Sequence, residues 1–267
     1  MCIAVFVWQS HPIYPFLLLL NRDEYHKRPT KPIYWWEGCE ILGGRDEIAG
    51  GTWLACTRDG RLAFLTNVME SPPFPEAKSR GDLPVRFLKS TLSPKEFAQE
   101  VIKEADQFNG FNLMLVDICS KTMVYVSNRP KGEPICVHEV SPGIHVLSNE
   151  KLDSTWPKAQ RLNQNFKKLL DKDGEGEITS KEMVEELMTD TVKADESRLP
   201  GIRSAIYEME TSSIFVGFDS PEGRYGTRST ALLCVKASGE VSFYEKYIEK
   251  GKWIEHTVDF TIEKVNK

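Results

Sequence analysis

Short apolar runs, each about the length of a β-strand, recur along this chain with turn residues between them. Runs of this kind are typical of buried or half-buried strands. Two of them flank the tripeptide Arg58-Asp59-Gly60, which indicates a hairpin turn. The pattern therefore predicts a protein built mainly from antiparallel strands. The runs lie at 2–8, 16–24, 51–57, 61–68, 111–118, 123–129, 134–140, 143–149, 212–219, 229–237, 240–248 and 252–262.

Helical patterns lie between these blocks of strands. Ser93-Pro94 followed by Glu96 is a helix start with proline in the first turn, and Pro157 begins a second helix. A third is indicated around 183–188. Blocks of strands and helices without regular βαβ alternation predict an α+β protein. We expect one domain, 1–267, with the acidic segment 171–198 as a candidate mobile insertion.

Charge and hydropathy exclude several classes of partner. The chain has 34 Lys and Arg against 39 Asp and Glu, a net charge of −5, with no long basic run, so nucleic acid is not an expected partner. The apolar start is broken by the segment 9–15 into runs well short of the ~20 residues that span a bilayer. Its first positive charge is Arg22, which does not fit a signal peptide. We therefore expect no transmembrane segment and a cytoplasmic protein.

The six cysteines are widely spaced and form no Cys-x-x-Cys pair. In a chain of this length without a secretory signal, we expect reduced thiols. Cys119 and Cys234 lie in or beside apolar runs and are interpreted as core residues. The pair Trp35-Trp36 fits the core better than a ligand groove, because aromatic side chains bury large areas.

Cys2 stands apart because only the initiator methionine precedes it. Removal of Met1 leaves a thiol and a free α-amine on one residue. The ordinary pKa values of an α-amine and a thiol are close, so the amine can accept the thiol proton near neutral pH. This arrangement activates a nucleophile without a separate base. The alternative is a buried strand cysteine with no chemical role.

A polar cluster, Asn21-Arg22-Asp23-Glu24, ends the second apolar run. If the first two strands pair, this cluster lies near the start of the first strand, beside Cys2. An arginine there favours a thiolate, and an aspartate can hold the α-amine. The alternative is a strand that emerges into solvent with surface charges.

Several motifs together resemble the NRDE family. They occur in order over roughly 2–262: MCIAVF, NRDE followed by RPT, GGTWLA, LTNV, NGFNL, LSN with a Trp-Pro soon after, and YGTRS. The resemblance implies a fold like that of the N-terminal-nucleophile hydrolases, a four-layer αββα sandwich of two mostly antiparallel sheets. It also implies a role in secretory-pathway and Golgi organisation, with haem or a lipid as cargo, no required cofactor, and peripheral association with Golgi or mitochondria.

The resemblance also implies a second function. Within the superfamily, the chain is similar to the cysteine-dependent choloylglycine hydrolases and penicillin V acylases, which cleave linear amides; an acyl amide would be the substrate. Cys2 would be the nucleophile, and Arg22 and Asp23 would lie beside it. An oxyanion hole would use Asn67, with a second asparagine at Asn149 and a late arginine at Arg228. Arg22 and Asp23 are adjacent here but separated in the amidases, and adjacent strand residues point to opposite faces unless a bulge intervenes.

The segment 171–182 matches a calcium-binding loop at five template positions, with an acidic residue, Glu175, at position five. The alternative is a helical hairpin with an acidic, glycine-rich turn, and we assign no metal site. The matching residues are Asp171, Asp173, Gly176, Ile178 and Glu182.

Overall fold

The computed structural model describes residues 1–71, 73–173 and 180–263. Contacts divide the chain into two compact units, each assembled from separate segments. The first unit comprises Met1–Lys27, Met69–Ser71 and Pro142–Asp259, and the second comprises Arg28–Val68, Pro72–Ser141 and Phe260–Lys267. The single domain 1–267 stays a prediction.

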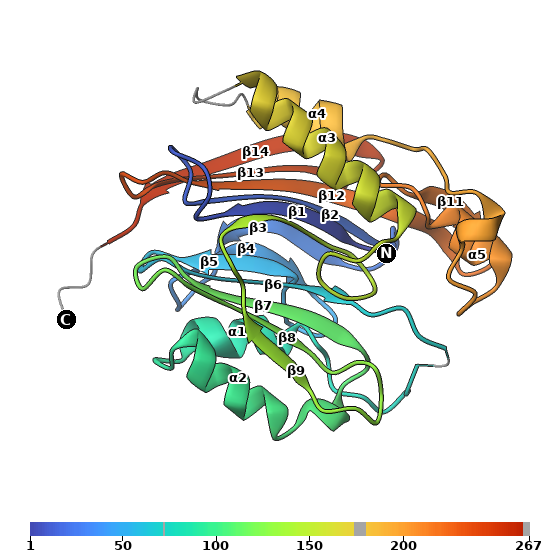
Figure 1. Ribbon diagram of the computed structural model, residues 1–267, viewed down its shortest axis with the longest axis horizontal. Helices are drawn as coiled ribbons and strands as arrows, with labels where there is room; N and C mark the ends of the chain where they lie inside the picture. The colour runs from blue at the N-terminus through green and yellow to red at the C-terminus, as the bar shows by residue number, and fades with distance from the viewer. Residues whose placement is uncertain (72, 174–179, 264–267) are drawn as a thin grey trace. The chain divides into compact units, whose positions relative to one another are not determined.

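A sheet forms the centre of the first unit, with strand order β10-β1-β2-β12-β13-β14 and β11 beside β12 (Figure 1). The expected pairing of the first two apolar runs is present, with Ile3 opposite Asn21. Between β2 and β12 the register shifts, so that Thr227 lies opposite Asp23 and Ser229 opposite Arg22. The strands are β1 (Ile3–Trp8), β2 (Phe16–Tyr25), β10 (Gly143–Leu147), β11 (Gly217–Ser220), β12 (Gly223–Val235), β13 (Glu240–Glu249) and β14 (Lys252–Thr261).

Two helices, α3 (Pro157–Asp173) and α4 (Ser180–Met188), lie along one face of this sheet (Figure 1). Because strand side chains alternate between faces, the odd-numbered positions of β1 and β2 point at the helices. The helix that was expected to begin at Pro157 is confirmed, and α4 carries the apolar face expected around 183–188. The buried cluster includes Ile3, Val5, Leu17, Leu19, Leu162, Phe166, Met183 and Leu187.

The second unit holds the other sheet, in the order β3-β4-β5-β6-β7-β8-β9. The hairpin predicted at Arg58-Asp59-Gly60 joins β5 to β6, and Gly60 adopts a positive φ of 86° that suits glycine. Two helices, α1 (Asp82–Lys89) and α2 (Pro94–Ile102), contact the strands β5–β8. The strands are β3 (Thr30–Trp35), β4 (Ile41–Asp46), β5 (Leu54–Thr57), β6 (Arg61–Asn67), β7 (Phe111–Asp117), β8 (Thr122–Ser127) and β9 (Cys136–Glu139).

The start of α2 follows the sequence closely. Ser93 and Glu96 form a reciprocal capping box, and Pro94 is the first helical residue. Two backbone N–H groups at the start of the helix, those of Ser93 and Glu96, are thereby satisfied. Antiparallel sheets, each with its own helices, bear out the α+β class.

Two local predictions were wrong. Of the run 212–219, only 217–219 belongs to a strand, β11 (Gly217–Ser220). The residues before it form hydrogen bonds outside the sheet: the Phe215 amide donates to Asp190 O at 2.7 Å, and Ser213 Oγ donates to Phe215 O at 2.7 Å. Cys119 is exposed in the turn after β7, rather than buried in the core. Trp36 is buried as expected, and Trp35 is half-buried.

All six cysteines are free thiols. Within the ranges described, no helix has the length and apolar character needed to cross a membrane. The same ranges contain no group of three His, Cys, Asp or Glu side chains that could hold a metal ion. The middle of the calcium-like loop, including Glu175, Gly176 and Ile178, lies outside the described residues.

Candidate functional site

Cys2 lies immediately before β1 and is half-buried, with its Sγ 3.9 Å from the Asp23 carbonyl oxygen. Continuing the β1–β2 register by one residue places Cys2 opposite Arg22, which is buried. Residues that lie opposite each other on neighbouring strands share a face. Cys2 and Arg22 therefore share the face that points away from α3 and α4.

Asp23 points to the helix-covered face, where its carboxylate meets the chain's amine. Its Oδ2 is 3.3 Å from the Met1 nitrogen, and its Oδ1 accepts a hydrogen bond from Thr227 Oγ1 at 2.7 Å. The Met1 amine also donates to the Tyr225 hydroxyl at 2.5 Å. Arg22 and Asp23 thus lie on opposite faces of a regular β2. Arg22 is on the face of the Cys2 thiol, and Asp23 is on the other face, where it pairs with the Met1 amine. The bulge lies instead on β12, at Arg228.

Lys158, near the start of α3, joins this cluster and was not among the predicted site residues. It is only 2% exposed, and its Nζ donates to Met1 O at 3.3 Å and to Thr211 O at 3.0 Å. Burial lowers the pKa of Lys158 from 10.5 to about 8, while the neighbouring Asp23 and Cys2 act in the opposite direction. Lys158, Leu162 and Phe166 are four residues apart and therefore lie on one face of the helix, which is apolar. This spacing is the sequence pattern that could have predicted a buried lysine at position 158.

Asn149 is brought close to Cys2 through Ser148, whose Oγ lies 3.1 Å from both Cys2 O and Asn149 Oδ1. Asn149 is buried, and its carbonyl accepts the Met69 amide at 2.7 Å. Arg228 donates from Nη1 to Tyr25 O at 3.3 Å. Asn67 ends β6 in the second unit, where it is exposed and lies opposite Phe111.

The other two residues of the predicted polar cluster, Asn21 and Glu24, form hydrogen bonds to backbone groups of the first unit. Asn21 is fully buried and donates from Nδ2 to Met188 O at 2.9 Å and Ile214 O at 3.0 Å, which ties β2 to the segments beside α4 and β11. Glu24 Oε1 accepts the Tyr25 amide at 2.8 Å. These bonds give Asn21 a structural role.

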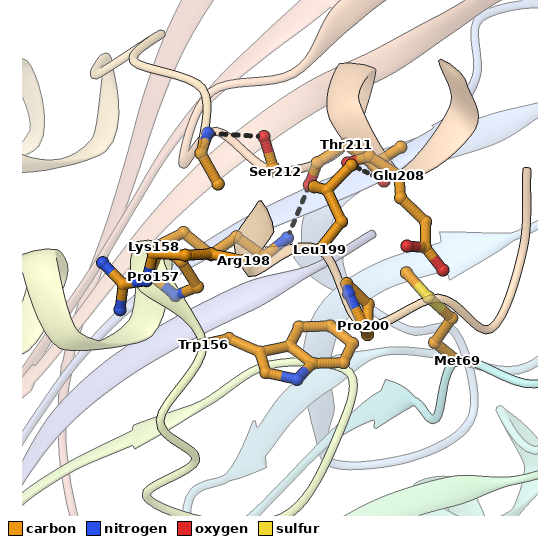
Figure 2. Close-up of a pocket in the computed structure, with 11 residues that line it drawn as sticks. Met69, Trp156, Pro157, Lys158, Arg198, Leu199, Pro200, Glu208, Thr211 and Ser212 are labelled. Atoms are coloured by element: carbon orange, nitrogen blue, oxygen red, sulfur yellow. Dashed lines mark hydrogen bonds between the residues drawn. The ribbon is translucent and has the colours of Figure 1, made fainter. Parts of the chain in front are cut away.

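A small pocket that is partly open to solvent adjoins the cluster, and Lys158 lines one side of it. Figure 2 shows the Lys158 ammonium directed toward Thr211, and Trp156 along the opposite side. Glu208 also lines the pocket, but its carboxylate accepts three backbone amides of the loop 201–203 at 2.6–2.8 Å. The remaining wall is largely apolar. The lining residues are Met69, Trp156, Pro157, Lys158, Ala194, Arg198, Leu199, Pro200, Glu208, Thr211 and Ser212.

Comparison with known proteins gives relatives over the whole chain. The family described as Transport and Golgi organisation 2 matches residues 1–250. Similar proteins are the Transport and Golgi organization 2 homolog of Mus musculus, 30% identical over 98% of this chain and 100% of that protein, and the Homo sapiens homolog, 29% identical with the same coverage. Among solved structures, the C2A mutant of the conjugated bile acid hydrolase from Clostridium perfringens is similar. Its TM-score is 0.52 at 11% identity, covering 98% of this chain and 97% of that chain. This likeness shows a fold of the N-terminal-nucleophile-hydrolase type.

Proposed function

Because this chain belongs to the Transport and Golgi organisation 2 family, we propose that it acts in transport and Golgi organisation by binding a small-molecule cargo, a lipid or haem. The family match supports the cellular role. The pocket beside Lys158 supports the binding role. In this proposal the protein works in the cytoplasm and associates peripherally with Golgi or mitochondrial membranes.

The pocket wall supports a ligand with an apolar part. Trp156, Leu199 and Pro200 offer apolar surface, while Lys158 supplies a buried cation at one side. Ligand sites are typically apolar clefts with a few precisely placed polar groups, and the lining of this pocket has that composition. For haem, Met69 is the lining residue whose side chain is of a type that ligates haem iron.

Direct binding tests the proposal. The full chain is titrated with a fluorescent acyl lipid and, separately, with haem. Leu199→Trp fills the pocket and is expected to weaken binding of the true ligand about tenfold or more, because the ligand's apolar surface stays in water. Ile102→Trp, a change at a partly exposed site in the second unit, is the matched control and should bind normally.

Absence of saturable binding of either ligand, or equal binding by Leu199→Trp, would refute the binding role. The cellular role has its own test. Deletion of the gene is expected to alter Golgi morphology and secretion, and normal Golgi and secretion in the deleted cells would contradict it.

A second candidate is a cysteine-dependent amidohydrolase that acts on a linear acylated amide. The observation that favours it is the placement of Arg22 on the face of Cys2, while Asp23 lies on the other face and pairs with the ammonium of Met1, the residue before Cys2. In this mechanism the Cys2 α-amine takes the thiol proton and the thiolate attacks the amide carbonyl, while asparagine amides such as Asn149 stabilise the oxyanion. The C–N bond then breaks, the amine leaves with the proton from the α-amine, and water hydrolyses the thioester to release the acid and free the thiol. Loss of one such donor typically raises the barrier by about 2.7–4 kcal/mol.

The intact mass of the protein from its own cells is measured first, because the α-amine base requires an unmodified chain beginning at Cys2. An amide substrate screen follows. Cys2→Ala is expected to abolish hydrolysis, since it removes the nucleophile, and Asn149→Ala to slow it about 100-fold or more. Cys119→Ala, which removes an exposed thiol, is the control. Full activity in Cys2→Ala, or a retained Met1 in an active preparation, would overturn this candidate.

A further inference from the structure

Strand β14 lies at one end of the sheet of the first unit, where it follows β13 (Figure 1). Within the described ranges β13 is the strand that it pairs with, so its other side is an edge of the sheet. None of its ten residues is buried. The backbone N–H and C=O groups along such an edge can pair with another strand. β14 therefore offers a long surface for strand pairing.

The other three strands at the ends of the two sheets are short or irregular. β9 has four residues and β10 has five. β3 has six, but it contains Pro32, and its register on β4 shifts between Lys31 and Tyr34. Short strands, prolines and irregular pairing are features that protect sheet edges against association. β14 is longer and contains no proline, so association is favoured at this edge.

The sequence of β14 is complementary to itself when two copies run antiparallel. Alternate side chains of a strand share a face, so Ile254, His256 and Val258 lie together. Ile254 and Val258 are only half-buried in the single chain. If the two copies are centred on His256, Ile254 of each copy lies opposite Val258 of the other. The four aliphatic side chains then cover one another.

The charges of β14 favour this register over its two neighbours. With His256 at the centre, Glu255 lies opposite Thr257 of the second copy, and Asp259 lies opposite Trp253. A centre at Glu255 would place two glutamates opposite each other. A centre at Thr257 would place Glu255 opposite Asp259. Like charges that are directly opposite destabilise a strand pair, so the register centred on His256 is preferred.

We propose that two copies of this chain pair antiparallel along β14, with His256 at the two-fold axis, so that the sheets of the two first units form one continuous sheet. A two-fold arrangement uses the same edge of both copies and is therefore closed. The contact is confined to one pair of strands, and small interfaces are typically weak. We therefore expect a dissociation constant of about 10 μM.

Sedimentation velocity of the full chain from about 1 to about 100 μM should show monomer converting to dimer. His256→Lys places two ammonium groups opposite each other and is expected to raise the dissociation constant about fivefold. Val258→Lys removes both aliphatic pairs and is expected to raise it about tenfold or more. His138→Lys, at an exposed histidine of the edge strand β9, is the matched control. Because His256 is exposed, its variant remains informative if Val258→Lys fails to fold.

A disulfide tests the register itself. Position 256 lies opposite its own copy, at about 4.5–5.5 Å between α-carbons, which a disulfide can bridge. His256→Cys is therefore expected to give a disulfide-linked dimer on mild oxidation. Thr257→Cys is the control, because position 257 lies opposite Glu255 and about 7–8 Å from its own copy. The wild-type chain gives the background from the exposed natural thiols, Cys119 and Cys136.

A chain that stays monomeric at about 100 μM would overturn the inference and leave β14 available to an extended segment of another protein. A dimer that is unchanged by both His256→Lys and Val258→Lys would overturn it too, because the contact would then lie elsewhere. Equal disulfide yields from His256→Cys and Thr257→Cys would exclude the register. A dimer that both lysine variants weaken, and that His256→Cys alone traps, is the expected result.

Discussion

A buried ammonium group is stable only where protein oxygens replace the water that it loses. Lys158 meets this condition with two backbone carbonyls, of Met1 and Thr211, and with the Asp23 carboxylate nearby. The compensation is incomplete, because burial still lowers the pKa of Lys158 to about 8. The Lys158 ammonium, which contacts Met1 and lines the pocket, therefore lowers the free energy of unfolding when it is charged.

That cost predicts a pH dependence with a definite sign. Between pH 8 and 10.5 the unfolded chain binds a proton at Lys158 that the folded chain has released, so stability from this residue rises with pH through that window and is flat below it. The full shift corresponds to about 3 kcal/mol. Chemical denaturation from pH 7 to 10 should show wild type gaining stability relative to Lys158→Met. Lys167→Met, on the exposed side of α3, is the control, and parallel curves for wild type and Lys158→Met would contradict the prediction.

Elements that are specified by residues close together in the sequence could be predicted. The capping residues Ser93 and Glu96, the glycine turn at Gly60 and the helix beginning at Pro157 each depend on bonds made within a few residues. Long-range pairing was not predictable. The Thr227–Asp23 bond spans 204 residues, and no periodicity in one strand specifies its register on another.

The residues of the candidate site likewise include some whose proximity was predictable from the sequence and some whose proximity was not. Cys2 and Asp23 could be placed together because β1 and β2 are joined by a short loop. Tyr225 and Lys158 arrive from β12 and α3, so their approach to Met1 depends on the whole first unit. The strand that was expected to begin at Ser212 failed for a related reason, since its backbone groups bond to partners that are distant in sequence, such as Asp190.

At the scale of the whole molecule, chain order and sheet order differ. The N-terminal strands β1 and β2 lie between β10 and β12, which come from the second half of the chain. They supply the apolar residues on which α3 and α4 pack, including Val5 and Leu19. No contiguous C-terminal piece therefore contains a complete sheet for the first unit.

We accordingly expect the fragment 142–267 to lack cooperative thermal unfolding, because β10 and β12 lose the strands between them and Val146 and Leu232 lose their buried neighbours. Far- and near-UV circular dichroism of the purified fragment is the measurement. A full chain nicked between exposed Lys131 and Gly132 keeps both pieces and should melt cooperatively, as should the fragment after it is mixed with 1–141 during refolding. Cooperative melting of 142–267 alone would mean that β10 and β12–β14 form a stable core without β1 and β2. The N-terminal strands would then be needed only to carry Cys2 and Asp23 to the site.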